Sequence, residues 1–242
     1  MFVTVPRMKP NIFPMFQYAD AASAIDWLVR ALGFTTERVQ TTPNGAVARA
    51  DLRFGAGAIG VRSAALATGP WAGIRQSVHV TVPDSVERTA NDLDGYLWSF
   101  GPDDLGAGTG EVTIVPELRY RSLTEATAWL DEHFGFETTF QVPGPDGVPI
   151  HVEMRLGDGT IYVTRMSTDN PDWADVKQFA SIVVDDPDRH HHRARAAGAN
   201  IVIPPRDTPF GARFYAVRDP ENVLWWLSTY RPAKPGARHP EG

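Results

Sequence analysis

The sequence contains no cysteine among its 242 residues. Disulfide bonds, thiolate metal sites and a cysteine nucleophile are therefore excluded together. The chain also lacks a stretch of about 18 apolar residues, the length that a membrane-spanning helix needs. Its N-terminus lacks the basic segment and apolar run of a secretory signal. We therefore expect a cytoplasmic protein without a membrane partner.

Clustered basic charge is missing as well. The 23 Lys and Arg residues are scattered along the chain, and 29 Asp and Glu residues give a formal net charge of −6. Because a nucleic-acid-binding surface needs a basic patch, we expect no nucleic-acid partner and predict a small-molecule ligand instead. The hydrophobic content of 43% suffices for a packed core. A monomer and a homodimer are both compatible with this composition.

The sequence repeats itself at a constant offset of 102 residues. Residues 11–63 align without a gap on residues 113–165, and sixteen of the 53 positions are identical. Trp27, for example, matches Trp129. A similarity of this length indicates a duplicated structural unit, which determines the architecture.

Both copies predict the same order of elements. In the first copy, a strand near 11–18 precedes a helix whose apolar residues have helical spacing and which ends at Gly33. Three further strands follow, near 35–41, 46–54 and 58–63. The second copy starts with a strand near 113–120 and has the same glycine at Gly135. Each unit is therefore predicted to be βαβββ.

The second halves of the two copies differ in length. After Asp186 the second copy predicts a helix, strands near 200–203 and 213–217, and a last strand within DPENVLWWLSTY. In the first copy, Leu97 matches Leu224 at an offset of 127 rather than 102, so about 25 residues are missing.

This difference predicts the domain organisation. We expect an N-terminal module with a shortened second half at 1–103, a linker at 104–112 and a complete C-terminal module at 113–232. The Pro- and Gly-rich residues 233–242 are expected to form a disordered tail.

The order of these motifs resembles the vicinal oxygen chelate superfamily, the group of glyoxalases, bleomycin-resistance proteins and extradiol dioxygenases. The motifs are LGF from Leu32, PDG followed by HVEMRLGDGTIYV from Pro145, VVDDPD from Val183, and DTPFGARFYAVRDPENVLWWLSTYRP from Asp207. The resemblance implies an α+β fold, in which repeated βαβββ units form curled mixed sheets with helices on the outside. It also implies a cavity enclosed by these sheets.

Enzymes of this superfamily hold a divalent metal in the cavity through His and Glu on the first and last strands of each unit. These ligands leave positions open at which the metal polarises substrate oxygens. The eight corresponding positions carry Phe13, Gly60, Phe179, Trp226, Val115, Tyr162, Ser77 and Ser99. None of them is His or a carboxylate, so we expect no metal site of this kind and no cofactor.

Aromatic residues at four of these positions, Phe13, Tyr162, Phe179 and Trp226, allow two interpretations. They fill a core, or they line a pocket, because an indole or phenyl face can stack on a planar ligand. The bleomycin-resistance branch of the superfamily sequesters a drug without a metal. The resemblance therefore favours a planar or aromatic ligand.

Three polar residues share strand faces with these positions. Gln17 alternates with Phe13, and Glu117 and Arg119 alternate with Val115. Charges on a face that borders a cavity need a partner, because burying them unpaired is costly. We predict all three as polar pocket residues. Because the first copy is truncated, we expect the pocket within residues 113–230.

Catalytic candidates are weak. His79 could act as a general base near neutral pH, although the sequence favours a hydrogen-bonded core histidine over this interpretation. His151 and Glu153 share one strand face and could be a nonstandard ligand pair or part of a solvated charged face. The tract of three histidines from His190 falls in a predicted helix and is interpreted as surface.

The sequence thus predicts a metal-independent small-molecule-binding protein with a role in antibiotic sequestration or resistance. The alternative is a metal-dependent or acid/base enzyme with displaced ligands, of the lyase, isomerase or dioxygenase-like type. A pseudo-enzyme that binds another protein is a third hypothesis. Whether the chain is catalytic stays open at this point.

Overall fold

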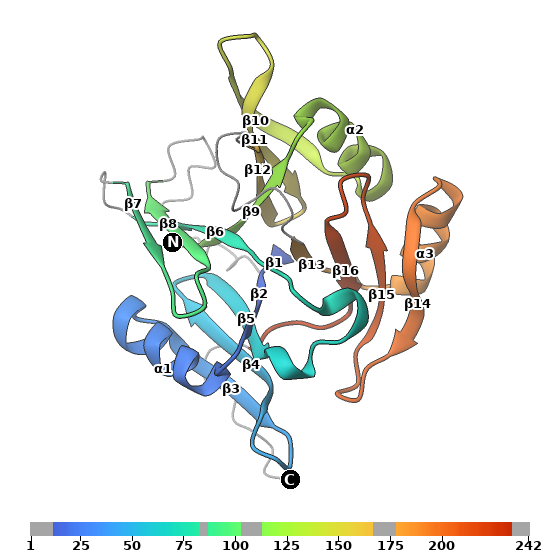
Figure 1. Cartoon of the computed structure of the whole chain (residues 1–242). Coiled ribbons are helices and arrows are strands. Elements are labelled where there is room, and N and C mark those ends of the chain that lie inside the picture. The colour runs from blue at the N-terminus through green and yellow to red at the C-terminus, as the bar shows by residue number, and fades with distance from the viewer. Residues whose placement is uncertain (1–11, 83–86, 103–112, 167–177, 234–242) are drawn as a thin grey trace, which may run out of the picture.

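The computed structural model describes residues 12–82, 87–102, 113–166 and 178–233 (Figure 1). Three sheets form the interior, and the helices α1, α2 and α3 lie on the outside of the molecule. The predicted α+β class with repeated βαβββ units is confirmed. The predicted linker at 104–112 and residues 234–242 of the predicted tail lie outside the described residues.

The first copy begins with a strand that proline divides. The elements are β1 (Ile12–Phe13), β2 (Met15–Tyr18), α1 (Ala21–Leu32), β3 (Thr35–Thr41), β4 (Val47–Phe54) and β5 (Gly57–Ser63). Pro14 has no N–H for a ladder hydrogen bond, so β1 and β2 can pair with different sheets. Asp20 caps α1 by accepting the Ser23 N–H, and Gly33 ends the helix at a φ of 78°.

The remainder of the first copy is short, as predicted. Two 3-10 turns, η1 (Ala64–Leu66) and η2 (Gly69–Trp71), lead to β6 (Ser77–Thr81), β7 (Arg88–Asn91) and β8 (Leu97–Gly101). Within the described part of this stretch no α-helix occurs. The strand that corresponds to the second copy's β14 is also missing from the described residues between β6 and β8.

The second copy has the full set of elements. They are β9 (Ile114–Tyr120), α2 (Leu123–Phe134), β10 (Glu137–Pro143), β11 (Pro149–Leu156), β12 (Gly159–Arg165), β13 (Phe179–Val183), α3 (Pro187–Ala196), β14 (Asn200–Asp207), β15 (Arg213–Arg218) and β16 (Leu224–Ser228). The predicted strand at 200–203 is longer than expected, because a bulge near Ile203 lets the pairing with β15 continue.

The two copies exchange strands. One sheet has the order β2-β5-β4-β3, a second β10-β11-β12-β9-β6-β8-β7 and a third β1-β13-β16-β15-β14. The antiparallel pairs β6–β9 and β1–β13 join one copy to the other. Consequently the first unit of copy one packs against the second unit of copy two, through a cluster that contains Phe13, Met15, Phe179 and Trp226.

Each copy nevertheless keeps its own core under its helices. In the first copy, the buried carboxylate of Asp92 accepts hydrogen bonds from the Tyr18 hydroxyl at 2.5 Å and the Trp98 indole at 2.9 Å. The second copy repeats this arrangement with Asp219, Tyr120 and Trp225. The same carboxylate also accepts backbone N–H groups of its own turn, so it fixes the turn before each last strand.

Candidate functional site

A cavity of about 280 Å³ lies between the first unit of copy one and the second unit of copy two. We call it the aromatic cavity. Its lining includes Met15, Arg49, Arg62, Trp71, Phe179, Phe210, Phe214 and Trp226. The strands β4 and β5 supply Arg49 and Arg62, and η2, β13, β15 and β16 supply most of the rings. The expectation of an aromatic pocket built from residues 113–230 alone is therefore wrong, because the copies exchange strands.

The rings of the aromatic cavity hold one another in place. Trp71 contacts Phe179 and Trp226 edge to face, with centroid distances of 5.7 and 6.3 Å, and Phe214 meets Trp226 in the same way at 5.6 Å. Edge-to-face pairs of this kind are favourable arrangements of aromatic quadrupoles. The walls are therefore rigid surfaces that need little ordering when a ligand binds.

Four of the superfamily's ligand positions lie on the strands around this cavity. They are Phe13 on β1, Gly60 on β5, Phe179 on β13 and Trp226 on β16. Phe179 and Trp226 line the cavity, and Phe13 is buried in the same cluster. Of the four aromatic residues predicted for one pocket, the structure brings these three together and places Tyr162 on another sheet.

The side chains at these positions do not fit a divalent metal. None carries a lone pair suited to one, and Arg49 brings a positive charge to the place of the missing carboxylate. A Cβ atom at Gly60 would lie 3.7 Å from Arg49 Nη2. Across the described parts of the chain, no group of three or more His, Asp or Glu residues could hold a metal ion.

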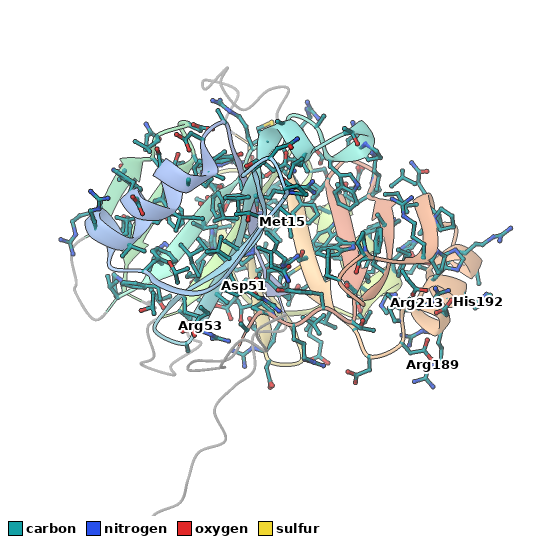
Figure 2. All side chains as sticks on the ribbon, turned by 90° about the horizontal axis from the view of Figure 1, so that it is seen from below. Met15, Asp51, Arg53, Arg189, His192 and Arg213 are labelled. Carbon is teal, nitrogen blue, oxygen red and sulfur yellow. The ribbon has the colours of Figure 1, made fainter. Side chains whose placement is uncertain are left out.

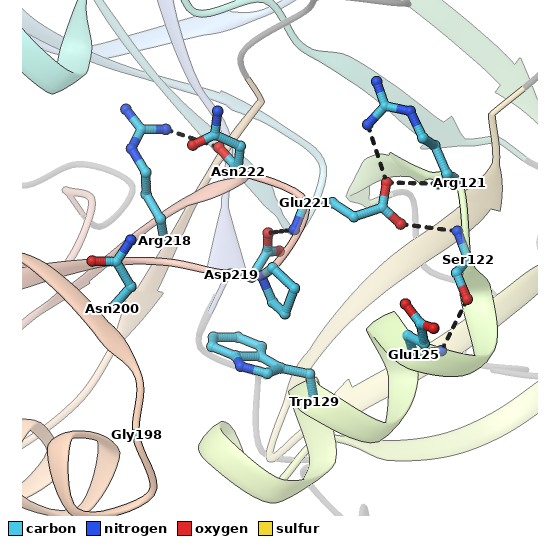
Figure 3. A pocket seen from close by; sticks show the side chains of 11 residues that line it. Arg121, Ser122, Glu125, Trp129, Gly198, Asn200, Arg218, Asp219, Glu221 and Asn222 are labelled. Carbon is cyan, nitrogen blue, oxygen red and sulfur yellow. Dashed lines mark hydrogen bonds and ion pairs between the residues drawn. The ribbon is translucent and has the colours of Figure 1, made fainter.

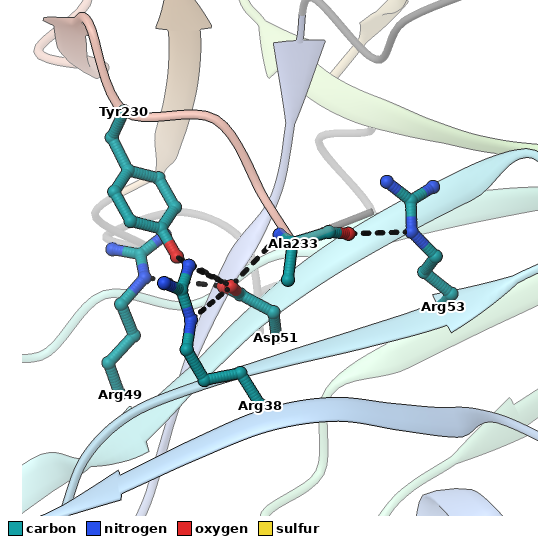
Figure 4. A network of polar contacts seen from close by, with 6 residues as sticks. All are labelled: Arg38, Arg49, Asp51, Arg53, Tyr230 and Ala233. Atoms are coloured by element: carbon teal, nitrogen blue, oxygen red, sulfur yellow. Dashed lines mark hydrogen bonds and ion pairs between the residues drawn. The ribbon is translucent and has the colours of Figure 1, made fainter. Parts of the chain in front are cut away.

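Arg49 is held by a buried polar network (Figure 4). Asp51 is 1% exposed and accepts hydrogen bonds from Arg38 Nη2 at 2.6 Å, the Tyr230 hydroxyl at 2.5 Å and the Ala233 N–H at 3.1 Å. Arg49 Nε lies 3.3 Å from the same carboxylate. Burial raises the pKa of Tyr230 to about 12, so its hydroxyl stays protonated and donates. The network fixes the guanidinium at the edge of the cavity.

Three buried side-chain N–H groups of the lining residues have no acceptor among the residues that the structure describes. They are Arg49 Nη2, Arg62 Nε and Trp226 Nε1. Burial, and secondarily the charge of Arg49, lowers the pKa of Arg62. Buried donors without partners are costly, so the site favours a ligand that can accept hydrogen bonds.

A second group of polar residues lies on the seven-stranded sheet. His79 Nδ1 lies 3.0 Å from Ser99 Oγ, and its ring is 5.5 Å from that of Tyr162, which also meets His151 at 4.9 Å. Glu117 pairs with Arg119 at 3.0 Å. Burial lowers the pKa of His151, and the nearby His79 adds to this effect while Glu117 opposes it.

The structure therefore separates residues that the sequence analysis combined into one pocket. Tyr162, Glu117 and Arg119 lie on this other sheet, together with the three remaining ligand positions Val115, Ser77 and Ser99. Gln17 is buried on β2, where its register partner on β5 is Arg62. Glu153 is 1% exposed and accepts a hydrogen bond from Thr139 at 2.7 Å.

The interpretation of the histidine tract as surface is wrong for two of its three members. His190 and His191 are buried, because α3 packs on β14 and β15 and successive helical residues point in different directions. His190 Nδ1 lies 2.7 Å from the Tyr215 hydroxyl, and burial lowers its pKa to about 4. Only His192 points outward at the edge of the molecule (Figure 2).

Sequence reasoning missed Arg49, Arg62 and Trp71. Arg49 aligns with His151 in the repeat, a position interpreted as part of a solvated charged face. The alternation along β4 did place Arg49 and Asp51 on one face. That face is covered, however, by the segment after β16 that contains Tyr230, some 179 residues later in the chain, which local patterns do not reveal.

A larger cleft of about 670 Å³ lies between α2 and the turn before β16 (Figure 3). Its polar groups pair with one another. Glu221 accepts the backbone N–H groups of Arg121 and Ser122 at 2.8 and 2.9 Å, and Arg218 Nη1 donates to the Asn222 carbonyl at 2.8 Å. We therefore interpret these polar groups as residues that stabilise the turn, and not as a ligand site.

Comparisons with known proteins give the following similarities. The family model described as "Glyoxalase/Bleomycin resistance protein/Dioxygenase superfamily" matches residues 112–227. Glyoxalase I from Zea mays superposes with a TM-score of 0.65 over 91% of this chain and 92% of the maize chain, at 14% identity. TioX from Micromonospora sp. ML1 is 35% identical over 49% of this chain and 97% of its own, with a TM-score of 0.42. No curated protein matches the chain.

The likeness to the maize enzyme is one of fold and extends over both copies. Within the described ranges, no helix is long and apolar enough to cross a bilayer.

Proposed function

Because the chain belongs to the glyoxalase/bleomycin resistance protein/dioxygenase superfamily, as its motifs predict, we propose that it binds a small planar molecule in the aromatic cavity. Binding does not use a metal ion. One observation supports the proposal: Phe179 and Trp226, at two of the superfamily's ligand positions, line a cavity together with further aromatic rings and arginines.

The size and shape of the cavity define the ligand. A volume of about 280 Å³ lies just below the usual range of ligand pockets, ~300–1,000 Å³. It therefore suits one or two fused rings. Trp226 and Phe179 are part of the lining, and stacking of a ligand ring on such a residue contributes about 0.5–1.5 kcal/mol per pair beyond the burial of area.

The biological role that fits such binding is sequestration of a planar antibiotic or a similar toxic compound. Sequestration needs affinity but no catalysed reaction, because binding alone lowers the concentration of free ligand by mass action. The absence of cysteine agrees with a pocket that does not react covalently through a thiol.

Titration of the EDTA-dialysed protein with bicyclic aromatic probes tests this function. We expect 2-naphthoate or 2-naphthamide to quench tryptophan fluorescence saturably, with one site per chain by calorimetry. Trp226→Ala should lose binding by about tenfold or more, since a stacking face is removed. Trp129→Ala is the matched control, because Trp129 stacks on His133 outside the cavity.

Two outcomes contradict the proposal. One is that neither 2-naphthoate nor 2-naphthamide binds saturably. The other is binding that appears only after a divalent cation is added.

An acid/base enzyme is the second candidate function, favoured by the grouping of His79 and His151 around Tyr162. The lowered pKa of His151 keeps its imidazole neutral near pH 7, the form that accepts a proton. The variant pair His79→Gln and His151→Gln separates the functions. Under the binding function these variants retain probe affinity, and mass spectrometry finds every probe chemically unchanged after incubation with the wild type.

A further inference from the structure

We propose that the molecule held in the aromatic cavity is a planar ring compound that carries an anionic group such as a carboxylate, which Arg49 and Arg62 bind. This inference rests on the proposed function and specifies its ligand class. It comes from three features of the cavity: the charge of its wall, its unpartnered donors and the fixed position of Arg49.

The wall of the cavity carries more positive than negative charge. Arg49, Arg62 and Arg206 line it, with Asp207 as the one acidic residue of the lining that the structure describes. Asp207 already lies 3.2 Å from Arg213 on the outside. Arg206 lies over the Phe214 ring at 5.2 Å, where the ring face stabilises a cation. Arg49 and Arg62 have no acidic partner within the described lining of the cavity.

Among the residues that the structure describes, the carboxylate that pairs with Arg49 is Asp51, and it is shared. The Asp51 carboxylate forms ion pairs with Arg38 Nη2 at 2.6 Å and with Arg49 Nε at 3.3 Å. One negative charge therefore faces two guanidinium groups. Arg62 Nη2 donates a hydrogen bond to the Leu66 carbonyl, which is uncharged. Burying cations without equal countercharge is unfavourable. An anionic ligand group supplies the missing charge.

The donors point to the same chemistry. Arg49 Nη2, Arg62 Nε and Trp226 Nε1 are all N–H groups, and arginine has no acceptor. A ligand that offers only donors leaves them unsatisfied. A carboxylate accepts several N–H groups at once, and its hydrogen bonds with guanidinium are about twice as strong as neutral ones. The aromatic faces meanwhile require a flat apolar body.

The side chain of Arg49 is preorganised for binding in the absence of a ligand. Its side chain is 6% exposed, its Nε contacts Asp51, and its Cζ lies over the Tyr230 ring. Little side-chain entropy is therefore lost on binding. Substitution by lysine would lose the planar stack as well as the fixed direction of the N–H groups.

Three probes with the same ring test the inference by calorimetry on the full chain at pH 7.5. They are 2-naphthoate, 2-naphthamide and 2-naphthylmethylammonium, which differ in charge and hardly in shape. We expect naphthoate to bind at least tenfold more tightly than naphthamide, and the ammonium probe to bind most weakly. Raising the salt from about 50 to 500 mM should narrow the gap between naphthoate and naphthamide, because salt screens charge.

Variants assign the effect to residues. Arg49→Met and Arg62→Met should bring the ratio of naphthamide to naphthoate dissociation constants down to about 1. Arg165→Met, which removes an arginine paired with Asp146 away from the cavity, should leave the ratio unchanged. Unfolding curves identify any variant that fails to fold, and the salt series on the wild type does not depend on variants.

The outcomes separate this inference from the proposed function. If naphthamide or the ammonium probe binds as tightly as naphthoate, the inference of an anionic ligand is overturned while the cavity remains a binding site. A preference for naphthoate that persists in both arginine variants overturns it too. If no probe binds, the proposed function itself fails.

Discussion

The guanidinium of Arg49 lies over the ring of Tyr230, with Arg49 Cζ 3.3 Å from the ring centroid. The contact joins β4 of the first copy to the residue that follows the last strand of the second. It also places a permanent cation beside the aromatic cavity. The stability of this joint and the binding chemistry of the cavity therefore depend on the same side chains.

Replacing Tyr230 should separate these contributions. Tyr230→Phe removes one hydrogen bond to Asp51 and should cost about 1–2 kcal/mol of the free energy of unfolding. Tyr230→Ala also removes the stack on Arg49 and the contact with Phe13, and should cost about 3–5 kcal/mol. Urea unfolding measures both. Equal losses of unfolding free energy for the two variants would show that the Tyr230 ring does not stabilise the contact between the two copies.

The duplicated turn gives a paired prediction. Tyr18→Phe and Tyr120→Phe each remove a hydroxyl that donates to a buried carboxylate, Asp92 or Asp219. Each should cost about 1.5–3 kcal/mol, the range for hydrogen bonds to charged groups. Because the two sites share no partner, the losses should add within about 0.5 kcal/mol in the double variant. Strong non-additivity would contradict two separate cores.

Divalent cations should not stabilise the protein. The positions that hold metal ligands in the superfamily's enzymes carry Phe13, Gly60, Phe179 and Trp226, and Arg49 repels a cation there. A ligand present at 100 times its dissociation constant adds ~2.7 kcal/mol of stability. Untagged protein with about 100 µM Zn²⁺, Ni²⁺ or Mn²⁺ should instead keep its melting temperature. A rise of several degrees that EDTA reverses would refute this prediction.

Stability should depend on pH through His190. Its folded pKa of about 4 lies below the unfolded value near 6.5. Between these values the unfolded chain binds more protons, so the free energy of unfolding rises with pH across this window. The neutral His190 therefore contributes to the free energy of unfolding above pH 6.5, and this contribution is lost as the pH falls towards 4. Its size is on the order of 2–3 kcal/mol.

The variant His190→Asn isolates this effect, because an Asn oxygen can still accept from Tyr215 but does not titrate. Burial raises the pKa of Asp219 to about 6, which gives an opposite slope in both proteins. The difference between wild type and variant cancels that slope. A difference that stays constant from pH 4.5 to 7 would exclude His190 as the titrating group.

Much of the fold could be predicted because the features that determine each repeat unit lie close together in the sequence. The constant offset, the cap at Gly33 and the alternation along the strands all act within one unit, and the structure follows them closely. The pairing of β1 with β13 and of β6 with β9 could not be predicted. Pairing within or between copies would bury the same apolar residues, so the pattern is the same for both.

The candidate site was predictable only in part for the same reason. Phe179 and Trp226 follow from the alignment of ligand positions, and both line the cavity. Trp71 lies in a segment without repeat partners, and Arg49 looks like a surface charge until the second copy covers it. Residues that meet through exchanged strands leave no local signal in the sequence.

A crystal structure of the EDTA-treated protein soaked with 2-naphthoate tests the central claim most directly. The expected result is a naphthalene ring between Trp226 and Phe179, with its carboxylate on Arg49 and Arg62 and no metal ion within contact distance. A ring bound elsewhere, or a metal ion coordinated in the aromatic cavity, would contradict the account.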